Sequence, residues 1–440
     1  MKPIKVGLLG VGNVGSGTFN VLQRNQEEIR RRAGRGIEVV AVSARNIERA
    51  QERTGGKVKV VANPFDIVND PEIDIVVELI GGYDDAKALV LQAIANGKHV
   101  VTANKALLAV HGNEIFAAAQ AKGVMVAFEA AVAGGIPIIK ALREGLTANR
   151  IEWLAGIING TTNFILSEMR DKGLDFATVL KQAQELGYAE ADPTFDIEGV
   201  DAAHKATIMS AIAFGIPVQF DKAHVEGISK LNAVDIRYAE QLGYRIKLLG
   251  IAKRATVNGK EGVELRVHPT LIPNKRLIAN VEGAMNAVLV QGDAVGATLY
   301  SGKGAGAEPT ASAVIADLVD ITRLATADPE HRVPHLAFQP NAMTNIEILP
   351  MSEVTTSYYL RMNVEDQPGV LADLTRILAD GTISIDAMMQ KEPAEGETRT
   401  DIIFLTHQTQ EKNVTAAIAK MEALSTVRGS VTKIRLENLS

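Results

Sequence analysis

The first 130 residues alternate between short runs that are almost wholly apolar and longer amphipathic stretches. The apolar runs are IKVGLLG, GIEVVAVS, IDIVVELIGG, HVVTANK and GVMVAFE. Short runs of this kind are typical of strands that are buried on both faces. Stretches such as DAKALVLQAIANG, which lie between them, have the apolar spacing of a helix. Strands that alternate with helices predict a parallel sheet with helices on both faces.

The pattern changes twice after residue 150. From 150 to 300, strand-like runs such as ELRVHPTLIP and VEGAMNAVLVQG accompany helical ones such as HKATIMSAIAFG, without a further nucleotide signal. After about residue 345, the order becomes strand, helix, strand, strand, helix, strand. That βαββαβ order is ferredoxin-like.

These patterns predict an α/β protein of four segments. Residues 1–135 form a Rossmann-type, doubly wound domain, to which a helix around 305–325 returns. Residues 136–325 form an inserted α+β domain, and such a block usually carries the substrate site and the oligomer interface. Residues 326–352 are a linker, and residues 353–440 form the ferredoxin-like βαββαβ domain.

Composition narrows the class of function. The net charge of −6 over 440 residues gives no reason to expect a nucleic acid or an anionic membrane as a partner. The chain has no cysteine, which excludes disulfides, thiolate metal sites and cysteine nucleophiles. The longest apolar run is shorter than a membrane span, and the apolar start is interrupted too early for a signal peptide. We therefore expect a cytoplasmic protein.

The first apolar run leads through a glycine-rich turn into a helix. Gly10, Gly12 and Gly15 have the G-x-G-x-x-G spacing of a dinucleotide-binding turn. The first glycine permits the tight bend, the second lets the backbone approach a pyrophosphate, and the third allows close helix–strand packing. Asn13 and Val14 open the helix, where unpaired N–H groups face the anion. The turn predicts a dinucleotide cofactor.

The end of the second predicted strand indicates which dinucleotide is bound. An acid at this point binds the ribose hydroxyls of NAD, but the sequence here is Ser43-Ala44-Arg45. An arginine can instead meet the 2′-phosphate of NADP, and Lys57 lies near enough in sequence to assist. We expect NADP, with NAD use left open. The alternative is that Arg45 is an ordinary surface residue.

Two more polar residues follow predicted strands. Lys105 closes the run HVVTANK, at the edge where open α/β sheets bind ligands, although a lysine there can also be merely solvated. Glu129 lies in the otherwise apolar run GVMVAFEAAVAGGIP and needs a partner if it is buried. Irregular backbone beyond it could turn carbonyl oxygens toward a monovalent cation.

The run GYAEADPTFDIEGVDAAHK, residues 187–205, is rich in carboxylates and ends on one lysine. Asp201 and Lys205 are four residues apart, so they share one face of a helix. They are either an exposed ion pair or part of a pocket, and the apolar sequence on both sides favours a buried helix. Carboxylates such as Glu190 could bind the ammonium of a zwitterion, and a lysine could give a proton to a reacting oxygen.

These stretches resemble homoserine dehydrogenases over essentially the whole chain. The matching motifs are GLLGVGNVGSG, VELIGG, VVTANKALLA, FEAAVAGGIPII, INGTTNFIL, GYAEADPTFDIEGVDAAHK and SGKGAGAEPTASAV. The resemblance implies NAD(P)H-dependent interconversion of L-aspartate 4-semialdehyde and L-homoserine in threonine, methionine and isoleucine biosynthesis. It also implies a homodimer or a higher homo-oligomer. The lack of cysteine agrees, because dehydrogenases that acylate a semialdehyde need a thiolate.

The resemblance implies roles for individual residues. Lys205 would be the acid/base at the carbonyl oxygen, Asp201 would hold or orient the substrate, and Lys105 would lie between cofactor and substrate as a second acid/base or carboxylate partner. The other substrate-binding candidates are Glu190, Asp196 and Thr161. A threonine in the position of Thr161 can also simply cap a helix.

The same resemblance adds contacts to the cofactor and to a cation. Gly187 and Gly302 would lie beside the cofactor. A structural, sodium-like site would use the backbone carbonyls of Glu129, Val132, Gly134 and Ile136.

The C-terminal segment resembles ACT domains through DQPGVL, residues 366–371. In ACT domains, backbone groups around this turn can bind an amino acid between paired domains. The residues concerned are Asp366, Gln367, Gly369 and Val370. Our hypothesis is feedback inhibition by L-threonine, and the alternative is a dimerisation module without a ligand.

Two rival functions differ from this hypothesis. One is another NADP-linked reductase of amino-acid-derived aldehydes. The other is a non-catalytic sensor that binds a nucleotide and an amino acid. A sensor would not need the Asp201–Lys205 pair, and a regulator would usually carry a basic recognition helix, which the sequence lacks.

Overall fold

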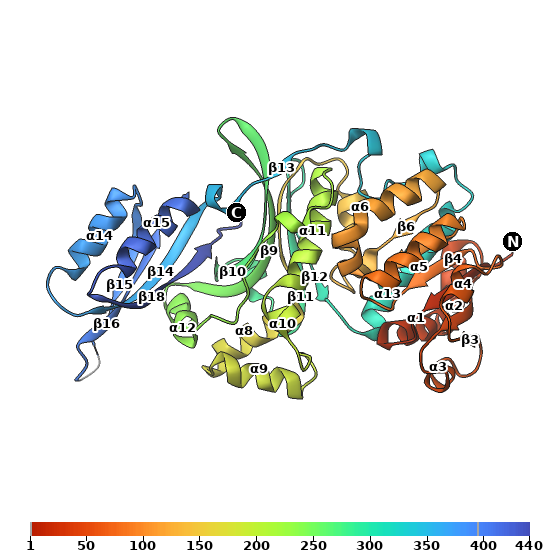
Figure 1. Ribbon diagram of the computed structural model, residues 1–440, viewed down its shortest axis with the longest axis horizontal. Helices are drawn as coiled ribbons and strands as arrows, with labels where there is room; N and C mark the ends of the chain where they lie inside the picture. The colour runs from red at the N-terminus through yellow and green to blue at the C-terminus, as the bar shows by residue number, and fades with distance from the viewer. Residues whose placement is uncertain (1, 394–395) are drawn as a thin grey trace.

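The computed structural model describes residues 2–393 and 396–440, and its three regions follow one another along the longest axis (Figure 1). The N-terminal region, red to orange, lies at one end, and the C-terminal region, blue, lies at the other (Figure 1). A large antiparallel sheet lies between them. Among the described helices, none has both the length and the apolar character that a membrane span requires.

The N-terminal region is built on a parallel six-stranded sheet. Its strands are β1 (Ile4–Leu9), β2 (Ile37–Ser43), β3 (Lys59–Val61), β4 (Ile75–Glu78), β5 (His99–Thr102) and β6 (Val126–Ala127). Their order, β3-β2-β1-β4-β5-β6, is that of the Rossmann fold. The predicted doubly wound sheet is therefore confirmed, and its switch point lies between the carboxyl ends of β1 and β4.

Helices cover both faces of this sheet. They are α1 (Asn13–Arg24), α2 (Gln26–Ala33), α3 (Ile47–Thr54), α4 (Phe65–Val68), α5 (Asp84–Ala95), α6 (Lys105–Lys122) and α13 (Ala307–Leu324). α13 follows the central region in sequence but packs against α1. The contact is so close that a Cβ atom on Gly17 would stand 2.6 Å from the carbonyl oxygen of Ala307. The last helix of the central segment is thus part of the N-terminal core.

The central region is an antiparallel sheet with helices on one face. Its main strands are β7 (Ile151–Ile157), β9 (Tyr244–Val257), β10 (Lys260–Pro273), β11 (Met285–Gly292) and β12 (Gly296–Lys303), in the order β12-β11-β7-β9-β10. Its helices are α7 (Ile138–Lys140), α8 (Gly160–Lys172), α9 (Phe176–Glu185), α10 (Thr194–Ile197), α11 (Val200–Phe214) and α12 (Ala233–Gln241). α11 packs on β9 and β10 and also touches α6, so it lies between this sheet and the N-terminal region (Figure 1).

Residues 326–352 connect α13 to the C-terminal region and run over the end of α11. Thr344 N–H donates to the carbonyl of Gly215, which ends α11 (2.8 Å). The short strand β13 (Glu347–Ile348) then pairs with β10. The predicted linker is therefore a segment that is hydrogen-bonded to the central region rather than a free tether.

The C-terminal region has the predicted ferredoxin-like order. Its elements are β14 (Thr355–Glu365), α14 (Val370–Asp380), β15 (Ile385–Gln390), β16 (Arg399–Thr406), β17 (Thr409–Gln410), α15 (Glu411–Glu422) and β18 (Val427–Leu436). β18 also pairs with β10, through Thr270 opposite Arg435 and Leu271 opposite Leu436. The sheets of the central and C-terminal regions are therefore continuous, a junction that the pattern of apolar residues did not reveal.

Candidate active site

The glycine-rich turn has the geometry of a dinucleotide cradle. Gly10 has φ +93°, which favours glycine, and a Cβ atom on Gly15 would stand 2.1 Å from the carbonyl oxygen of Gly10. A Cβ atom on Gly12, in contrast, would meet nothing within 4 Å. The first and third glycines are thus required by the turn itself, whereas the second leaves open space in front of the backbone. This division matches the roles predicted from the spacing.

The start of α1 is open to an anion. Gly12 precedes Asn13 and Val14 and has no side chain to cap the helix, so no side chain occupies the first N–H groups. Arg53 of α3 reaches this turn and donates to the carbonyl of Val11 (2.5 Å). Arg53 was missed in the sequence, because no spacing rule connects the end of α3 to the turn.

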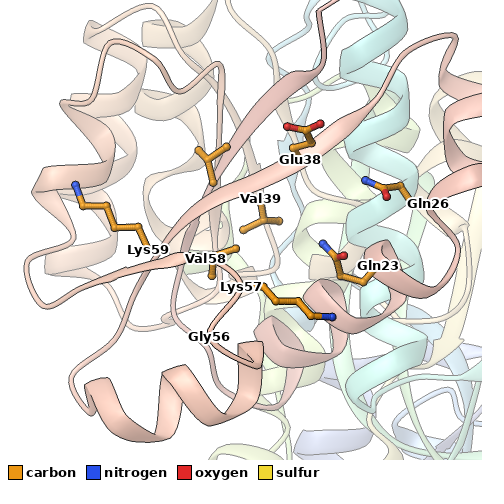
Figure 2. A pocket seen from close by; sticks show the side chains of 9 residues that line it. Gln23, Gln26, Glu38, Val39, Gly56, Lys57, Val58 and Lys59 are labelled. Atoms are coloured by element: carbon orange, nitrogen blue, oxygen red, sulfur yellow. The ribbon is translucent and has the colours of Figure 1, made fainter.

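The two basic residues expected at the 2′-phosphate lie in different places. Arg45 is exposed and follows β2 at the carboxyl edge of the sheet. Lys57 lies two residues before β3, whose first residue pairs with Ala41 of β2, and it lines a surface pocket of about 530 Å³ with Gln23 and Gln26 (Figure 2). The role predicted for Lys57 at the 2′-phosphate stays a prediction.

Buried polar side chains shape the carboxyl edge next to the cradle. Glu78, fully buried at the end of β4, accepts hydrogen bonds from the N–H groups of Ile80 and Gly81 (2.9 and 3.0 Å). Asn104 donates to the carbonyl of Gly82 (2.8 Å). These side chains hold the paired-glycine turn after β4, and the sequence analysis had assigned neither of them a role.

Lys105 lies where the N-terminal and central regions meet. It is the first residue of α6, directly after β5, and its side chain is 35% exposed. Its Nζ atom stands 3.2 Å from Oδ1 of Asp201 and 6.0 Å from the centre of the Phe195 ring. The lysine is therefore paired with the central region and is not merely solvated.

Asp201 and Lys205 form a buried ion pair on α11. Lys205 Nζ stands 2.6 Å from Oδ2 of Asp201 and donates to the carbonyl of Ile158 (2.8 Å). The exposed fractions of their side chains are 11% for the lysine and 4% for the aspartate. The alternative of an exposed ion pair is thus ruled out, because an exposed i,i+4 pair would leave both groups in water.

Asn159 connects two of the carboxylates. It precedes α8, where its Oδ1 accepts from Thr162 N–H (2.8 Å). Its Nδ2 donates to Asp196 Oδ1 (2.7 Å) and to Asp201 Oδ2 (2.9 Å). Asn159 was not among the predicted site residues, although its position before a helix was a capping signal.

Thr161 is held in the same cluster. Its hydroxyl lies 2.7 Å from the carbonyl of Tyr188 and 3.3 Å from Oδ2 of Asp196. The cap of α8 is Asn159 rather than this threonine. Thr161 therefore joins the acidic loop to the start of α8.

The cluster shifts the pKa values of its members in different directions. For Asp201, burial raises the pKa, but the ammonium groups of Lys205 and Lys105 outweigh burial and hold it well below its usual range. Burial lowers the pKa of Lys205, and the charge of Asp201 opposes that effect. Burial and the charge of Asp201 raise the pKa of Asp196. At neutral pH the site holds an ionised aspartate between two lysines, and burial favours loss of the proton from Lys205.

The remaining candidates from residues 187–205 are Glu190 and Gly187, which lie on the surface of the protein. Glu190 is exposed, and its backbone carbonyl, rather than its carboxylate, accepts a hydrogen bond from Gln184 (3.0 Å). Gly187 is exposed with φ +76°. The structure does not bring either residue into hydrogen-bonding contact with Asp201 or Lys205.

The backbone of the segment after Glu129 packs closely against the turn that follows β12. A Cβ atom on Gly134 would stand 2.5 Å from the carbonyl oxygen of Gly304, and one on Gly302 would stand 3.2 Å from Ile136. Ala133 and Gly134 both have positive φ. Gly302 therefore lies against the predicted cation segment, and its contact with the cofactor stays a prediction.

Glu129 itself is buried and fully engaged. Its carboxylate accepts hydrogen bonds from the N–H groups of Ile139 (2.9 Å) and Lys140 (2.8 Å), and its own N–H donates to Asp317 (2.8 Å). Burial raises the pKa of Glu129 to about 7 and that of Asp317 to about 7. Within the described residues, no group of three or more His, Asp or Glu side chains could hold a metal ion. A cation here would have to be bound mainly by backbone carbonyls.

The residues predicted for the C-terminal ligand site form the turn between β14 and α14. Gly369, with φ +98°, precedes α14, which begins at Val370. Asp366 N–H donates to the carbonyl of Thr398 (2.9 Å), and Gln367 N–H donates to that of Glu365 (3.1 Å). No side chain caps the start of α14.

Three family models match successive parts of the chain. They are homoserine dehydrogenase, NAD binding domain, over residues 10–129, homoserine dehydrogenase over 137–319 and the ACT domain over 358–425. The second of these matches also covers the first part of α13, which packs in the N-terminal region.

Individual relatives match over the full length. A homoserine dehydrogenase from Pseudomonas aeruginosa is 63% identical over 440 residues, which are 100% of both chains. A crystal structure of a homoserine dehydrogenase from Thiobacillus denitrificans has a TM-score of 0.95 and 72% identity, covering 100% of this chain and 99% of that one. A hyperthermophilic archaeal homoserine dehydrogenase in complex with NADPH matches with a TM-score of 0.62 and 25% identity, covering 74% of this chain and 99% of that one.

These matches confirm the resemblance that the motifs carried and the presence of a nucleotide-binding domain and an ACT domain. The chain belongs to the homoserine dehydrogenase family of oxidoreductases.

Proposed function

We propose that this chain interconverts L-homoserine and L-aspartate 4-semialdehyde with NADP, as part of threonine, methionine and isoleucine biosynthesis. The observation that carries the proposal is the buried Asp201–Lys205 pair, joined by Lys105 at the carboxyl edge of the nucleotide-binding sheet. A reaction that moves a hydride and a proton needs an acid/base next to the nicotinamide. Lys105 links the two regions at the place where such a group is required.

The chemistry divides between the cofactor and the protein. When bound, the nicotinamide supplies or accepts the hydride. Lys205 holds or removes the proton at the substrate oxygen, with Asp201 and the carbonyl of Ile158 fixing the direction of its Nζ atom. Lys105 is the second acid/base or the partner of the substrate carboxylate, since it is more exposed than Lys205.

The substrate is a zwitterion and needs partners for both charges. Glu190, exposed on the loop before α10, would bind the ammonium group. Asp196, which is half-buried with Thr161 beside it, would support that site. The rival aldehyde reductase would use the same lysines but would have less need of these carboxylates.

We propose that Arg45 selects NADP through the 2′-phosphate. It follows β2 at the cofactor edge and is exposed there, and Lys57 would assist it. NAD remains a second substrate in this account, because the cradle at Gly10, Gly12 and Gly15 contacts only features common to both cofactors.

We also propose that a sodium-like cation binds the carbonyls of Glu129, Val132, Gly134 and Ile136. The positive φ angles of Ala133 and Gly134 and the burial of the segment support this proposal. The role would be structural, because the segment joins the N-terminal and central regions. Thermal unfolding at constant ionic strength in NaCl and in tetramethylammonium chloride would test it, and equal midpoints would contradict it.

We propose that the C-terminal region binds L-threonine as a feedback inhibitor and that the chain acts as a homodimer or higher homo-oligomer. The ACT match and the uncapped start of α14 at Gly369 support the first part. Threonine should lower the rate with homoserine, and Asp366→Ala should weaken that inhibition without changing the uninhibited rate. Equal rates with and without saturating threonine would leave only the dimerisation role.

The main test is the reduction of NADP by the purified protein in the presence of L-homoserine. Wild type should show homoserine-dependent reduction, and Lys205→Ala should lower kcat by roughly 100-fold or more, as expected for loss of a general acid/base. Lys105→Ala should have a smaller effect on kcat and a larger one on the KM for homoserine. The exposed Lys230 offers the control Lys230→Ala, which should match wild type.

Two outcomes would contradict this assignment. Near-wild-type turnover of Lys205→Ala would remove the lysine from the chemistry. A lack of homoserine-dependent reduction by wild type, with cofactor binding confirmed, would favour the rival reductase or the sensor.

Cofactor choice has its own test. Arg45→Ala should raise the KM for NADP roughly tenfold or more, because hydrogen bonds to a charged group are lost, and should leave the KM for NAD unchanged. Lys230→Ala, which removes an exposed charge from the central region, is the control and should alter neither value. If both variants affected NADP equally, the effect would be a general loss of positive charge and not a contact with the phosphate.

A further inference from the structure

A short segment between α11 and α12 packs against the turn that separates Asp196 from Asp201. Residues 224–228, here called the support segment, begin with β8 (His224–Val225), which pairs with β10. Ile228 N–H then donates to the carbonyl of Ile197 (2.8 Å). Ile197 ends α10, so the support segment is hydrogen-bonded to the turn between α10 and α11.

The fit between this segment and the turn leaves no room for adjustment. A Cβ atom on Gly227 would stand 2.3 Å from the carbonyl oxygen of Ile197 and 2.4 Å from Cα of Glu198. One on Gly199, which has φ +83°, would stand 3.3 Å from Val225. A displacement of the support segment would therefore move the turn.

The turn determines the distance between two site residues. Asp196 lies one residue before Ile197, and Asp201 lies in the first turn of α11. Asn159 bridges their carboxylates with hydrogen bonds of 2.7 and 2.9 Å. A change in the turn would therefore move Asp196, which is proposed to act at the substrate ammonium, relative to Asp201, which orients Lys205.

The support segment is in turn fixed by the ACT domain. Arg435, on β18, is 1% exposed and donates to both carboxylate oxygens of Glu226, at 2.9 Å each. The same guanidinium also bonds Glu411, the first residue of α15, at 2.9 and 2.6 Å. A bidentate arginine–carboxylate pair fixes both distance and orientation. His224 adds a contact of 2.8 Å to Glu226.

We propose that Glu226 is a positioning residue that ties the ACT domain to the turn between Asp196 and Asp201 and thereby sets the affinity for the amino-acid substrate. The inference rests on the proposed function and adds a structural route from the ACT domain to the substrate site. An amino acid that shifts α15 or β18 moves Arg435, Glu226 and the support segment in order. The nucleotide cradle lies outside this route, so cofactor affinity is independent of it.

The test compares wild type with Glu226→Gln, which keeps the size of the side chain and removes its charge. The KM for homoserine should rise roughly 2- to 30-fold, the range found for mutations that alter coupling between sites. The KM for NADP should stay within about twofold of the wild-type value, because the proposed route does not couple Glu226 to the nucleotide cradle. A merely structural role would lower thermal stability and the active fraction but leave the KM for homoserine unchanged.

Glu437→Gln is the matched control. Glu437 also pairs with a buried arginine, Arg266 (2.6 Å), at the same junction, but its hydrogen bonds do not reach the support segment. This variant should leave the KM for homoserine unchanged. Equal KM values for Glu226→Gln and wild type, or equal increases in both glutamine variants, would overturn the proposal.

A second measurement does not depend on turnover. Hydrogen exchange of backbone amides should be faster in residues 194–203 and 224–228 of Glu226→Gln than of wild type, and unchanged there in Glu437→Gln. If wild type failed to oxidise homoserine, the proposed function would fall, and the exchange data would still decide whether Glu226 positions the turn. Unchanged exchange in both segments would reject the positioning role.

Arg435→Lys provides a second variant at the other end of the contact. Lysine keeps the positive charge but cannot form the bidentate pair with Glu226, so the KM for homoserine should also rise. The double variant Glu226→Gln/Arg435→Lys should raise the KM for homoserine no more than the more severe single variant does. The reason is that both changes break the same contact between Arg435 and Glu226. Fully additive effects would mean that the two residues act independently, against the proposal.

Discussion

The buried ion pair between Asp201 and Lys205 is the constraint on which the rest of the site depends. Removing two charges from water costs several kcal/mol for each ion, so the pair persists only if its other hydrogen-bonding positions are filled. Ile158, Asn159 and Lys105 fill them. The first two lie between β7 and α8 and the third in the N-terminal region, so the pair fixes both of these parts of the fold around α11.

The position of α11 follows from small residues beneath it. A Cβ atom on Gly250 of β9 would stand 3.1 Å from Cβ of Ala206, so a larger side chain would push the helix away from the sheet. The end of the helix is held by Thr344 of the connecting segment, and its start is held by the turn that rests on residues 224–228. Both supports lead toward the C-terminal region, as the route proposed for Glu226 requires.

Local patterns predicted the parts of this protein that are built from neighbouring residues. The spacing of Gly10, Gly12 and Gly15 predicted a turn whose steric reasons the structure supplies, and the i,i+4 spacing of Asp201 and Lys205 predicted a shared helix face. The order of strands and helices predicted the Rossmann and ferredoxin-like sheets.

Contacts between distant segments were beyond the reach of those patterns. Arg53 was not predicted at the glycine-rich turn, because its contact with Val11 depends on how α3 packs against that turn. The bridge made by Asn159 and the contact between Glu226 and Arg435 depend on which elements meet in space. Spacing along the sequence does not contain that information.

The most direct test of this account is the pH dependence of kcat for aldehyde reduction in Asp201→Asn and in wild type. Burial lowers the pKa of Lys205, and the charge of Asp201 opposes that decrease. Because reduction needs the protonated lysine, activity is lost as pH rises through its pKa. Removing the aspartate charge should therefore move this alkaline limb to lower pH. An alkaline limb at the same pH in both proteins would show that the ion pair does not control the proton at the reacting oxygen.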